Sequence, residues 1–362
     1  MPALIDNCGM QPIPLDAALW NWGSTTATTV QHLGRACTRL QQAGDSTPLV
    51  AAAGLELLDG TIEADVAVGP ERSFHGVFWR GQDAENYESF FVRPHQVGNP
   101  DSIQYTPVFN DVSGWQLYHG PGYWNAIDFP LDTWFTIRVV FAGRRAEIHV
   151  AGELALVVPE LKAEPKRGAI GIFAGGETLH VSAFRYDVAA NLTEPAPTEP
   201  EPPPGVVPRW SVSDPFAEHE LPAALDTAAL SARTWTQLEA EPLGLADLAR
   251  VNGIKDDKNT VFARTRLHSP HAQLLPLDLG FSDRAVVFLN GRRLYRGDDS
   301  YRSRDYRFLG SIGYYDTVYL PLAEGDNELV VAVSESFGGW GIQAREAFGE
   351  APEGAYPNIR YG

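Results

Sequence analysis

Short segments of alternating apolar and polar residues fill most of this 362-residue chain. In the stretch GTIEADVAV, Ile62, Ala64 and Val66 fall on one face of an extended strand. Glu63 and Asp65 fall on the opposite face. Gly, Pro, Asp or Asn lies near most joins between such segments, and segments with the helical period are nearly absent. This pattern predicts an antiparallel β-sandwich.

A proline- and glutamate-rich stretch, AANLTEPAPTEPEPPPGVVPR, interrupts the pattern at residues 189–209. It contains seven of the 27 prolines, so an extended, semi-rigid linker is expected. Strand patterns resume after it in NTVFARTRLHS, AQLLPLDLGF, RAVVFLNGRRLYRG and NELVVAVSE, and Asn290-Gly291 is a strong hairpin signal. We predict an all-β protein of two β-sandwich (jelly-roll) domains in tandem, residues 1–188 and 210–362.

Two resemblances support this division. The stretches DGTIEADVAV, FHGVFWRGQDAENYESFFVRP, QYTPVFNDVSGWQLYHG and WFTIRVVFAGRRAEIHV resemble the concanavalin A-like/laminin G-like sandwiches, in particular family-16 glycoside hydrolase-like domains. The stretches VVFLNGRRLYRG and PLAEGDNELVVAVSESFGGWGIQAR resemble the galactose-binding-like jelly roll. The resemblances imply carbohydrate binding by both domains.

Charge narrows the classes of partner. The formal net charge is −18, which argues against nucleic acid and against anionic membranes as partners, because both attract basic surfaces. No apolar run approaches the ~18 residues of a membrane helix, and no secretory signal is evident. A cytoplasmic location is expected, and a periplasmic or secreted one is the alternative if a signal was removed. Likewise Cys8 and Cys37 are either two free thiols or one bridge.

Glu63 and Asp65 are candidate catalytic carboxylates. Family-16 enzymes carry a Glu-x-Asp-x-(x)-Glu motif on one strand, and here Ala67 or Val68 replaces the final Glu. The retaining mechanism, which needs two carboxyl groups about 5–5.5 Å apart, is therefore not expected. Glu63 and Asp65 then either form a solvated strand face or pair with arginine, or they keep a catalytic role with an acid from another strand. His95 is a further catalytic candidate.

Several polar and aromatic side chains are predicted to line a ligand groove on one open sheet face. Arginine is costly inside a sandwich, while amides and aromatic rings suit sugars. The alternative is that the aromatic residues are core residues and the arginines cap sheet edges. The residues of this predicted groove are Arg80, Arg93, His95, Gln104, Tyr105, Asn110, Trp115 and Gln116.

A second polar cluster lies in GDDSYRSRDYRFLG, residues 297–310. Its three arginines, Arg302, Arg304 and Arg307, alternate with acids, so a self-neutralising loop is the simplest interpretation, with a ligand rim as an alternative. No cofactor is expected, with calcium as an alternative through Asp298, Asp299 or Glu335.

Three functions remain open. The first is non-catalytic binding of a glycan or glycoside by the two modules. The second is a glycoside-active hydrolase or lyase with a site unlike that of family 16. The third is an enzyme that acts on an apolar small molecule inside a sandwich cavity. The sequence does not indicate which ligand is bound or the oligomeric state.

Overall fold

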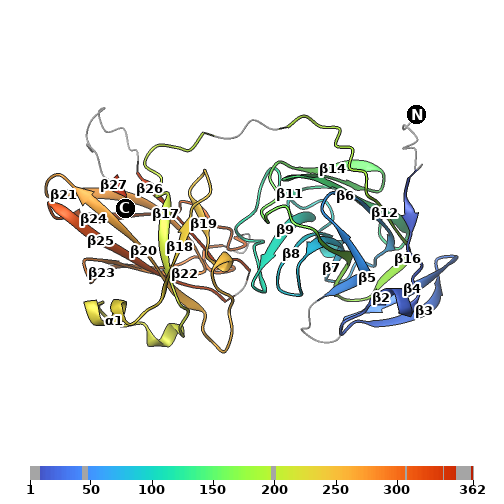
Figure 1. The fold of residues 1–362 in the computed structure, drawn as a ribbon, viewed down its shortest axis with the longest axis horizontal. Coiled ribbons are helices and arrows are strands. Elements are labelled where there is room, and N and C mark those ends of the chain that lie inside the picture. The colour runs from blue at the N-terminus through green and yellow to red at the C-terminus, as the bar shows by residue number, and fades with distance from the viewer. Residues whose placement is uncertain are drawn as a thin grey trace. The chain divides into compact units, whose positions relative to one another are not determined.

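The chain is an all-β protein of two β-sandwiches, as expected (Figure 1). The computed structural model describes residues 9–42, 48–196, 201–305, 308–336, 338–347 and 360–361. Two compact units divide it. Unit 1 comprises Met1–Val108 and Tyr118–Pro197, and unit 2 comprises Phe109–Leu117 and Thr198–Gly362. The boundary at residue 197 falls inside the expected linker, but residues 109–117 belong to unit 2 rather than to the first sandwich.

Unit 1 contains two antiparallel sheets. Sheet I has the order β14-β13-β12-β6-β16-β4-β3, and β1 pairs with β16. Its strands are β1 (Gln11–Pro12), β3 (Thr26–His32), β4 (Arg35–Gln41), β6 (Gly60–Ala67), β12 (Trp134–Ala142), β13 (Arg145–Val150), β14 (Glu153–Val158) and β16 (Leu179–Asp187). Sheet II has the order β9-β8-β7-β15-β5-β2, and β11 pairs with β9. Its strands are β2 (Trp20–Asn21), β5 (Leu49–Leu57), β7 (Ser73–Gly81), β8 (Tyr87–Val92), β9 (Ile103–Phe109), β11 (Trp124–Asn125) and β15 (Gly168–Gly176).

The core of unit 1 lies between these sheets and follows the period-2 pattern of the sequence. Ile62, Ala64 and Val66 of β6 are fully buried in it, and Val77 and Trp79 of β7 contribute from the other sheet. Glu63 and Asp65 consequently lie on the outer face of sheet I. Two 3₁₀ turns, η1 (Ala17–Leu19) and η2 (Pro94–Gln96), complete the described part of this unit.

Unit 2 also contains two antiparallel sheets. Sheet III has the order β18-β17-β20-β25-β22-β23, and β27 pairs with β20; sheet IV has the order β19-β26-β21-β24. The strands are β17 (Arg209–Ser213), β18 (Trp235–Glu239), β19 (Leu245–Asp247), β20 (Thr260–Ser269), β21 (Gln273–Ser282), β22 (Arg284–Leu289), β23 (Arg292–Asp298), β24 (Asp316–Leu322), β25 (Gly325–Ser334), β26 (Gly341–Glu346) and β27 (Arg360–Tyr361). Short helical pieces join them: η3 (Glu218–Glu220), α1 (Thr227–Ser231) and η4 (Leu248–Arg250).

Sheet III is covered on both faces. Its inner face packs on sheet IV through residues such as Ala285, Val287 and Val331. Its outer face carries Phe288 and Val330, in contact with a cluster that residues 216–235 supply. Burial on both faces explains why β25 reads as an almost continuous apolar run rather than as an alternation.

The segment Phe109–Leu117 supplies part of the unit 2 interior, including β10 (Val112–Ser113). Val112 is buried in the core of unit 2. The Gln116 amide nitrogen donates to the carbonyl of Gly338 at 2.9 Å, and the amide of Ile312 donates to the carbonyl of Gln116 at 2.9 Å. Unit 2 is therefore assembled from two separate pieces of chain.

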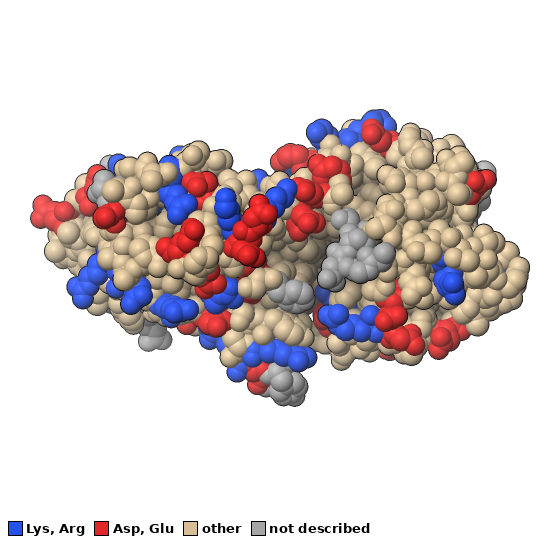
Figure 2. All heavy atoms as spheres, turned by 90° about the horizontal axis from the view of Figure 1, so that it is seen from below, with Lys and Arg blue, Asp and Glu red and all other residues tan. Residues whose placement is uncertain are grey.

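Charged side chains of both signs lie on the surface. On the face that Figure 2 shows, basic and acidic side chains are interspersed, and neither sign covers a broad continuous area. Of the helices in the described part of the chain, none combines the length and the apolar composition needed to cross a bilayer.

Candidate functional site

Arg80 of the predicted groove points into the sandwich rather than onto an open face. Its side chain is buried, with 2% of the residue exposed. The guanidinium donates to the carbonyls of Leu58 and Gly143 at 2.7 Å each and pairs with Asp59 at 3.1 Å. Strict alternation places Arg80 on the outer face, but its φ of 48° breaks the alternation and turns the side chain toward the core ring of Phe141.

Arg93 lies on the expected outer face of sheet II, but it is not open to solvent. Its guanidinium lies over the rings of Phe74 and Phe91, at 5.7 and 5.0 Å from their centroids. It donates to the carbonyl of Asp101 at 2.6 Å and to the side-chain oxygen of Gln104. Burial lowers the pKa of Arg93 to about 10. These contacts give Arg93 a packing role and use two of its guanidinium nitrogens as donors.

The two arginines lie at opposite ends of their strands. In the register of β7 and β8, Trp79 is opposite Glu88 and His75 is opposite Val92. Positions 80 and 93 are therefore about 20 Å apart along the strand direction, at ~3.3 Å per residue. His95 lies near Arg93, with its ring edge against Phe74 at 5.6 Å, and burial lowers the pKa of His95. Arg80 therefore cannot share one site with Arg93 and His95.

The remaining residues of the predicted groove are also engaged in packing. Tyr105 lies in the core of unit 1, where its hydroxyl donates to Glu88 and accepts from the backbone of Lys162. Asn110 and Gln116 donate to backbone carbonyls of unit 2, at residues 249 and 309, at 2.8 Å each. Trp115, of the same segment, has its ring centroid 6.5 Å from that of Tyr301. The predicted groove is thus divided between the two units; in unit 1 the structure brings Arg93, His95 and Gln104 together but not Arg80.

Glu63 and Asp65 pair with arginine, which is one of the two interpretations offered above. Glu63 accepts from Arg138 at 2.7 Å and from Arg185 at 3.0 Å. Asp65 accepts from Arg185 at 2.8 and 3.0 Å and from Thr136 at 2.7 Å. These hydrogen bonds raise the pKa of Arg185. Glu63, Arg138 and Arg185 of this network line a cavity of about 460 Å³, and their charges largely satisfy one another.

The 297–310 cluster of unit 2 is held by internal pairing over its described part. Arg304 donates to Asp299 at 2.7 Å and to Asp316 at 2.9 Å. Asp298 accepts from both the backbone and the hydroxyl of Ser300. Arg307 lies outside the described residues.

Glu335 is fully buried and accepts from Ser282 at 3.2 Å. Within the described ranges, no three side chains of metal-ligating type form a group. Cys37 is a buried free thiol, and Cys8 lies outside the described residues.

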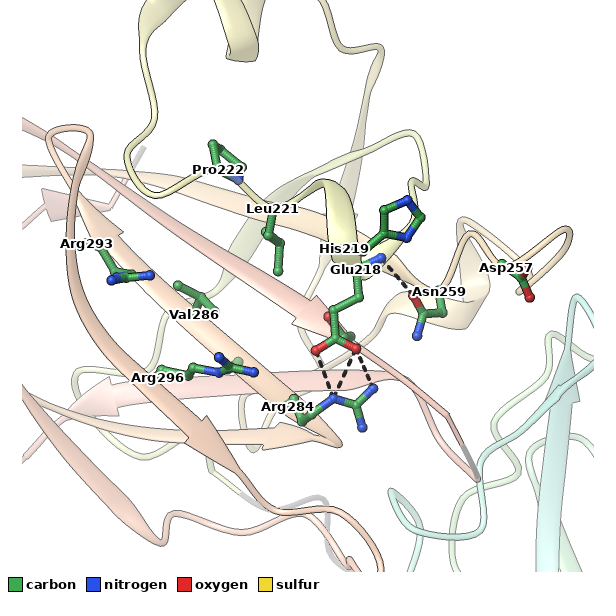
Figure 3. A pocket seen from close by; sticks show the side chains of 12 residues that line it. Glu218, His219, Leu221, Pro222, Asp257, Asn259, Arg284, Val286, Arg293 and Arg296 are labelled. Carbon is green, nitrogen blue, oxygen red and sulfur yellow. Dashed lines mark hydrogen bonds and ion pairs between the residues drawn. The ribbon is translucent and has the colours of Figure 1, made fainter.

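A different site stands out in unit 2. A cavity of about 580 Å³ lies on the outer face of sheet III, over β22 and β23 (Figure 3). We call it the arginine pocket. Its lining combines three arginines, other polar groups and an apolar floor: Glu218, His219, Leu221, Pro222, Asp257, Asn259, Arg284, Ala285, Val286, Arg293, Arg296 and Ser334.

A β-bulge places two of these arginines on one face. In the register of β22 and β23, Arg293 is opposite Phe288 and Arg296 is opposite Val286, with one extra residue, Leu294, between them. Phe288 and Val286 belong to the outer cluster of sheet III, so their partners share that face. Leu294 and Tyr295 both pack toward the inner core instead. Without the bulge, positions 293 and 296 would face opposite sides.

The third arginine holds one wall of the pocket in place. Arg284 forms a bidentate ion pair with Glu218, with contacts of 2.9 and 2.7 Å. Glu218 opens η3, and its backbone nitrogen donates to the Asn259 side chain at 3.2 Å. Figure 3 shows the Glu218–Arg284 contacts beside the guanidinium of Arg296, and the hydrogen bond to Asn259 on the side of His219.

Arg293 and Arg296 themselves are exposed and form no hydrogen bond or ion pair with any residue that the structure describes. The pocket therefore presents two unused guanidinium groups over the partly exposed side chain of Val286. Sequence reasoning missed this site. The available signal was the density of arginine after the hairpin turn, at positions 292, 293 and 296. Regular alternation places Arg293 and Arg296 on opposite faces of the strand. The bulge that places them on the same face cannot be recognised from the pattern of apolar and polar residues.

No model of a protein family and no curated protein matches the sequence. Several solved structures are similar to part of the chain. The carbohydrate-binding module CBM66 from Bacillus subtilis is 15% identical over 47% of this chain and 92% of its own, with a TM-score of 0.32. A putative glycosyl hydrolase from Parabacteroides distasonis is 12% identical over 48% and 90%, with a TM-score of 0.33.

A β-glucanase from Bacillus licheniformis is 13% identical over 49% of this chain and 98% of its own, with a TM-score of 0.32. At these identities and TM-scores the likenesses assign neither a family nor a ligand.

Proposed function

We propose that the protein binds a carbohydrate without transforming it, and that the arginine pocket of unit 2 holds the sugar. The observation that carries this proposal is a cavity of about 580 Å³ in which two unpaired arginines stand beside an apolar floor. Small-molecule sites usually measure about 300–1,000 Å³ and combine apolar walls with a few convergent polar groups.

The lining has the two kinds of group that a sugar needs. Each arginine carries five N–H donors in a fixed plane, which can reach several hydroxyl oxygens of one ring. The ring of His219 adds a donor or an acceptor at the rim. Val286 and Leu221 offer apolar surface to the C–H face of a pyranose. The sequence resemblance of this part of the chain to galactose-binding-like domains supports the same assignment.

Binding without catalysis fits the state of the carboxylates. A glycosidase needs two carboxyl groups that can reach the scissile bond. Glu63 and Asp65 are held by arginine in unit 1, and Glu218 is held by Arg284 in the arginine pocket. These carboxylate oxygens already accept short hydrogen bonds from within the protein, so they are poorly placed to attack or protonate a sugar.

Hydrogen–deuterium exchange with a panel of soluble polysaccharides tests the proposal. A bound glycan should slow exchange in peptides that cover residues 216–223 and 284–298, because these contribute the walls of the pocket. Protection confined to peptides around Arg93, or around Glu63 and Arg185, would place the site in unit 1 and contradict the proposal. No protection with any polysaccharide would contradict carbohydrate binding itself.

A further inference from the structure

We infer that the arginine pocket selects an acidic sugar, one whose ring carries a carboxylate or a sulfate group. The inference rests on the proposed function, because it takes the pocket to be a carbohydrate site and specifies the class of carbohydrate. Three observations carry it: the unpaired guanidinium groups, the local charge balance and the spacing that the bulge imposes.

The first observation is that, within the described part of the chain, neither Arg293 nor Arg296 forms an ion pair, although Asp298 interacts with Arg296 at longer range. By contrast, Arg138 and Arg185 on the outer face of sheet I are both paired with Glu63. In the pocket, Glu218 is used by Arg284. A planar guanidinium matches two oxygens of a carboxylate or sulfate at once, which gives short, charge-assisted hydrogen bonds. A neutral sugar would leave that positive charge uncompensated.

The second observation is the contrast between the pocket and the chain as a whole. The protein carries a net charge of −18, whereas the pocket sets three arginines against two carboxylates, Glu218 and Asp257. Once Arg284 and Glu218 have paired, both remaining arginines lie on the β23 side, while Asp257 lies on the opposite side, near Asn259 (Figure 3). The positive charge is therefore local and faces the cavity.

The third observation is the distance between the two arginines along the sheet. Their partners on β22, Phe288 and Val286, are two residues apart. The two positions are therefore about 7 Å apart along the strand, at ~3.3 Å per residue. Long, flexible side chains that start this close can reach the same acidic group or adjacent groups on one sugar residue. Val286 lies opposite Arg296 and supplies the apolar contact beneath the ring.

The test compares acidic polysaccharides with neutral forms of the same backbone. The probes are polygalacturonate, alginate and hyaluronan, each beside its carboxyl-reduced form, and carrageenan beside its desulfated form. Affinity electrophoresis of the full chain gives the retardation for each pair, and titration calorimetry gives Kd. At least one acidic probe should bind tenfold or more tightly than its neutral counterpart. The carboxylate pairs and the sulfate pair separate the two sources of negative charge.

Variants identify the residues responsible. Arg293→Ala and Arg296→Ala should each weaken binding of the acidic probe by about tenfold to a hundredfold, as expected for a lost charge-assisted hydrogen bond. Arg292→Ala is the matched control, because Arg292 is an exposed arginine of the same strand, lies opposite the inward-facing Leu289 and does not line the pocket. It should bind as the unaltered protein does. Since all three arginines are exposed, melting temperatures should stay within a few degrees.

The outcomes separate the inference from the function on which it rests. Equal binding of acidic and neutral forms, or equal losses in Arg292→Ala and Arg293→Ala, would overturn the acidic-sugar inference and leave carbohydrate binding in place. Failure of every probe, acidic and neutral, would overturn both. Tight binding of an acidic probe that survives the Arg293→Ala/Arg296→Ala double change would also overturn the inference.

Discussion

Arg93 illustrates how a residue that resembles a ligand contact can instead be part of the fold. Its guanidinium lies over the rings of Phe74 and Phe91 and donates hydrogen bonds to Asp101 and Gln104. Only 4% of the residue is exposed. Sequence alternation correctly placed it on the outer face of sheet II. The pattern could not reveal that this face is covered, because coverage depends on loops distant in sequence.

Truncating Arg93 should therefore cost stability and not affinity. Arg93→Ala removes the donor to the Gln104 side chain and to a backbone carbonyl, leaving buried acceptors unsatisfied. The expected loss is about 1–3 kcal/mol of the unfolding free energy of unit 1. Urea unfolding measures the loss, and calorimetry with the best polysaccharide measures Kd per folded molecule. A larger Kd with an unchanged free energy of unfolding would mean that Arg93 contacts the ligand.

His75 should make unit 1 sensitive to acid. It is fully buried, neither ring nitrogen has a hydrogen-bond partner among the described residues, and burial together with the charge of His180 lowers its pKa to about 3. In the unfolded chain His75 takes up a proton near pH 6.5, whereas in the folded chain it stays neutral until the pH approaches 3. Stability is therefore complete above about pH 6.5 and falls as the pH drops toward 3, by up to ~1.4 kcal/mol per pH unit.

The variant His75→Leu tests this assignment. It removes the titrating ring from an apolar core, so the loss of unfolding free energy between pH 7.5 and pH 5 should shrink by about 2 kcal/mol. Urea titrations at several pH values give the comparison. Parallel pH profiles for the two proteins would mean that His75 is protonated as readily in the folded state as in the unfolded state.

At the scale of elements, the strands could be predicted from the sequence, but the points at which they depart from regular strand geometry could not. The alternation in GTIEADVAV correctly predicted that Ile62 and Val66 face the core and that Glu63 faces outward. Two positions depart from the regular alternation. Arg80 has a positive φ, and β23 carries a bulge at Leu294. Both depend on the pairing register with a neighbouring strand, which a single strand's pattern does not contain.

Removing the bulge should remove the site. Insertion of one alanine between Val287 and Phe288 gives Leu294 a partner and restores regular pairing between β22 and β23, so that residues 293 and 296, three positions apart, fall on opposite faces. Binding of the acidic polysaccharide should then weaken at least as much as in Arg293→Ala. Leu294→Ala is the control, since it keeps the residue count and the bulge. Retained binding in the insertion variant, with its melting transition intact, would show that the bulge does not position the arginines.

At the scale of the whole molecule, chain connectivity sets which fragments can fold. The tandem arrangement and the boundary region near 189–209 were expected, whereas the inclusion of residues 109–117 in unit 2 was not. This nine-residue piece resembles an ordinary turn in sequence. Its partners, such as Leu309 and Gly338, lie about 200 residues away along the chain, where local patterns carry no information.

A fragment that begins after the linker should consequently be incomplete. Residues 198–362 alone lack Val112, whose burial contributes roughly 1.5–3 kcal/mol, and the Gln116 hydrogen bonds to residues 309, 312 and 338. Expressed alone, the fragment should unfold at a lower urea concentration than unit 2 does in the full chain. A synthetic 109–117 peptide added in excess should restore part of the difference. Equal midpoints without the peptide would mean that the segment is dispensable.

A crystal of the full chain soaked with an acidic oligosaccharide tests the central claim most directly. The oligosaccharide is chosen from the polysaccharide that binds best. We expect electron density for the sugar over β22 and β23, with its acidic group within about 3 Å of the guanidinium of Arg293 or Arg296. Sugar density over the Glu63–Arg185 network, beside Arg93, or elsewhere on the protein with the arginine pocket empty would contradict it.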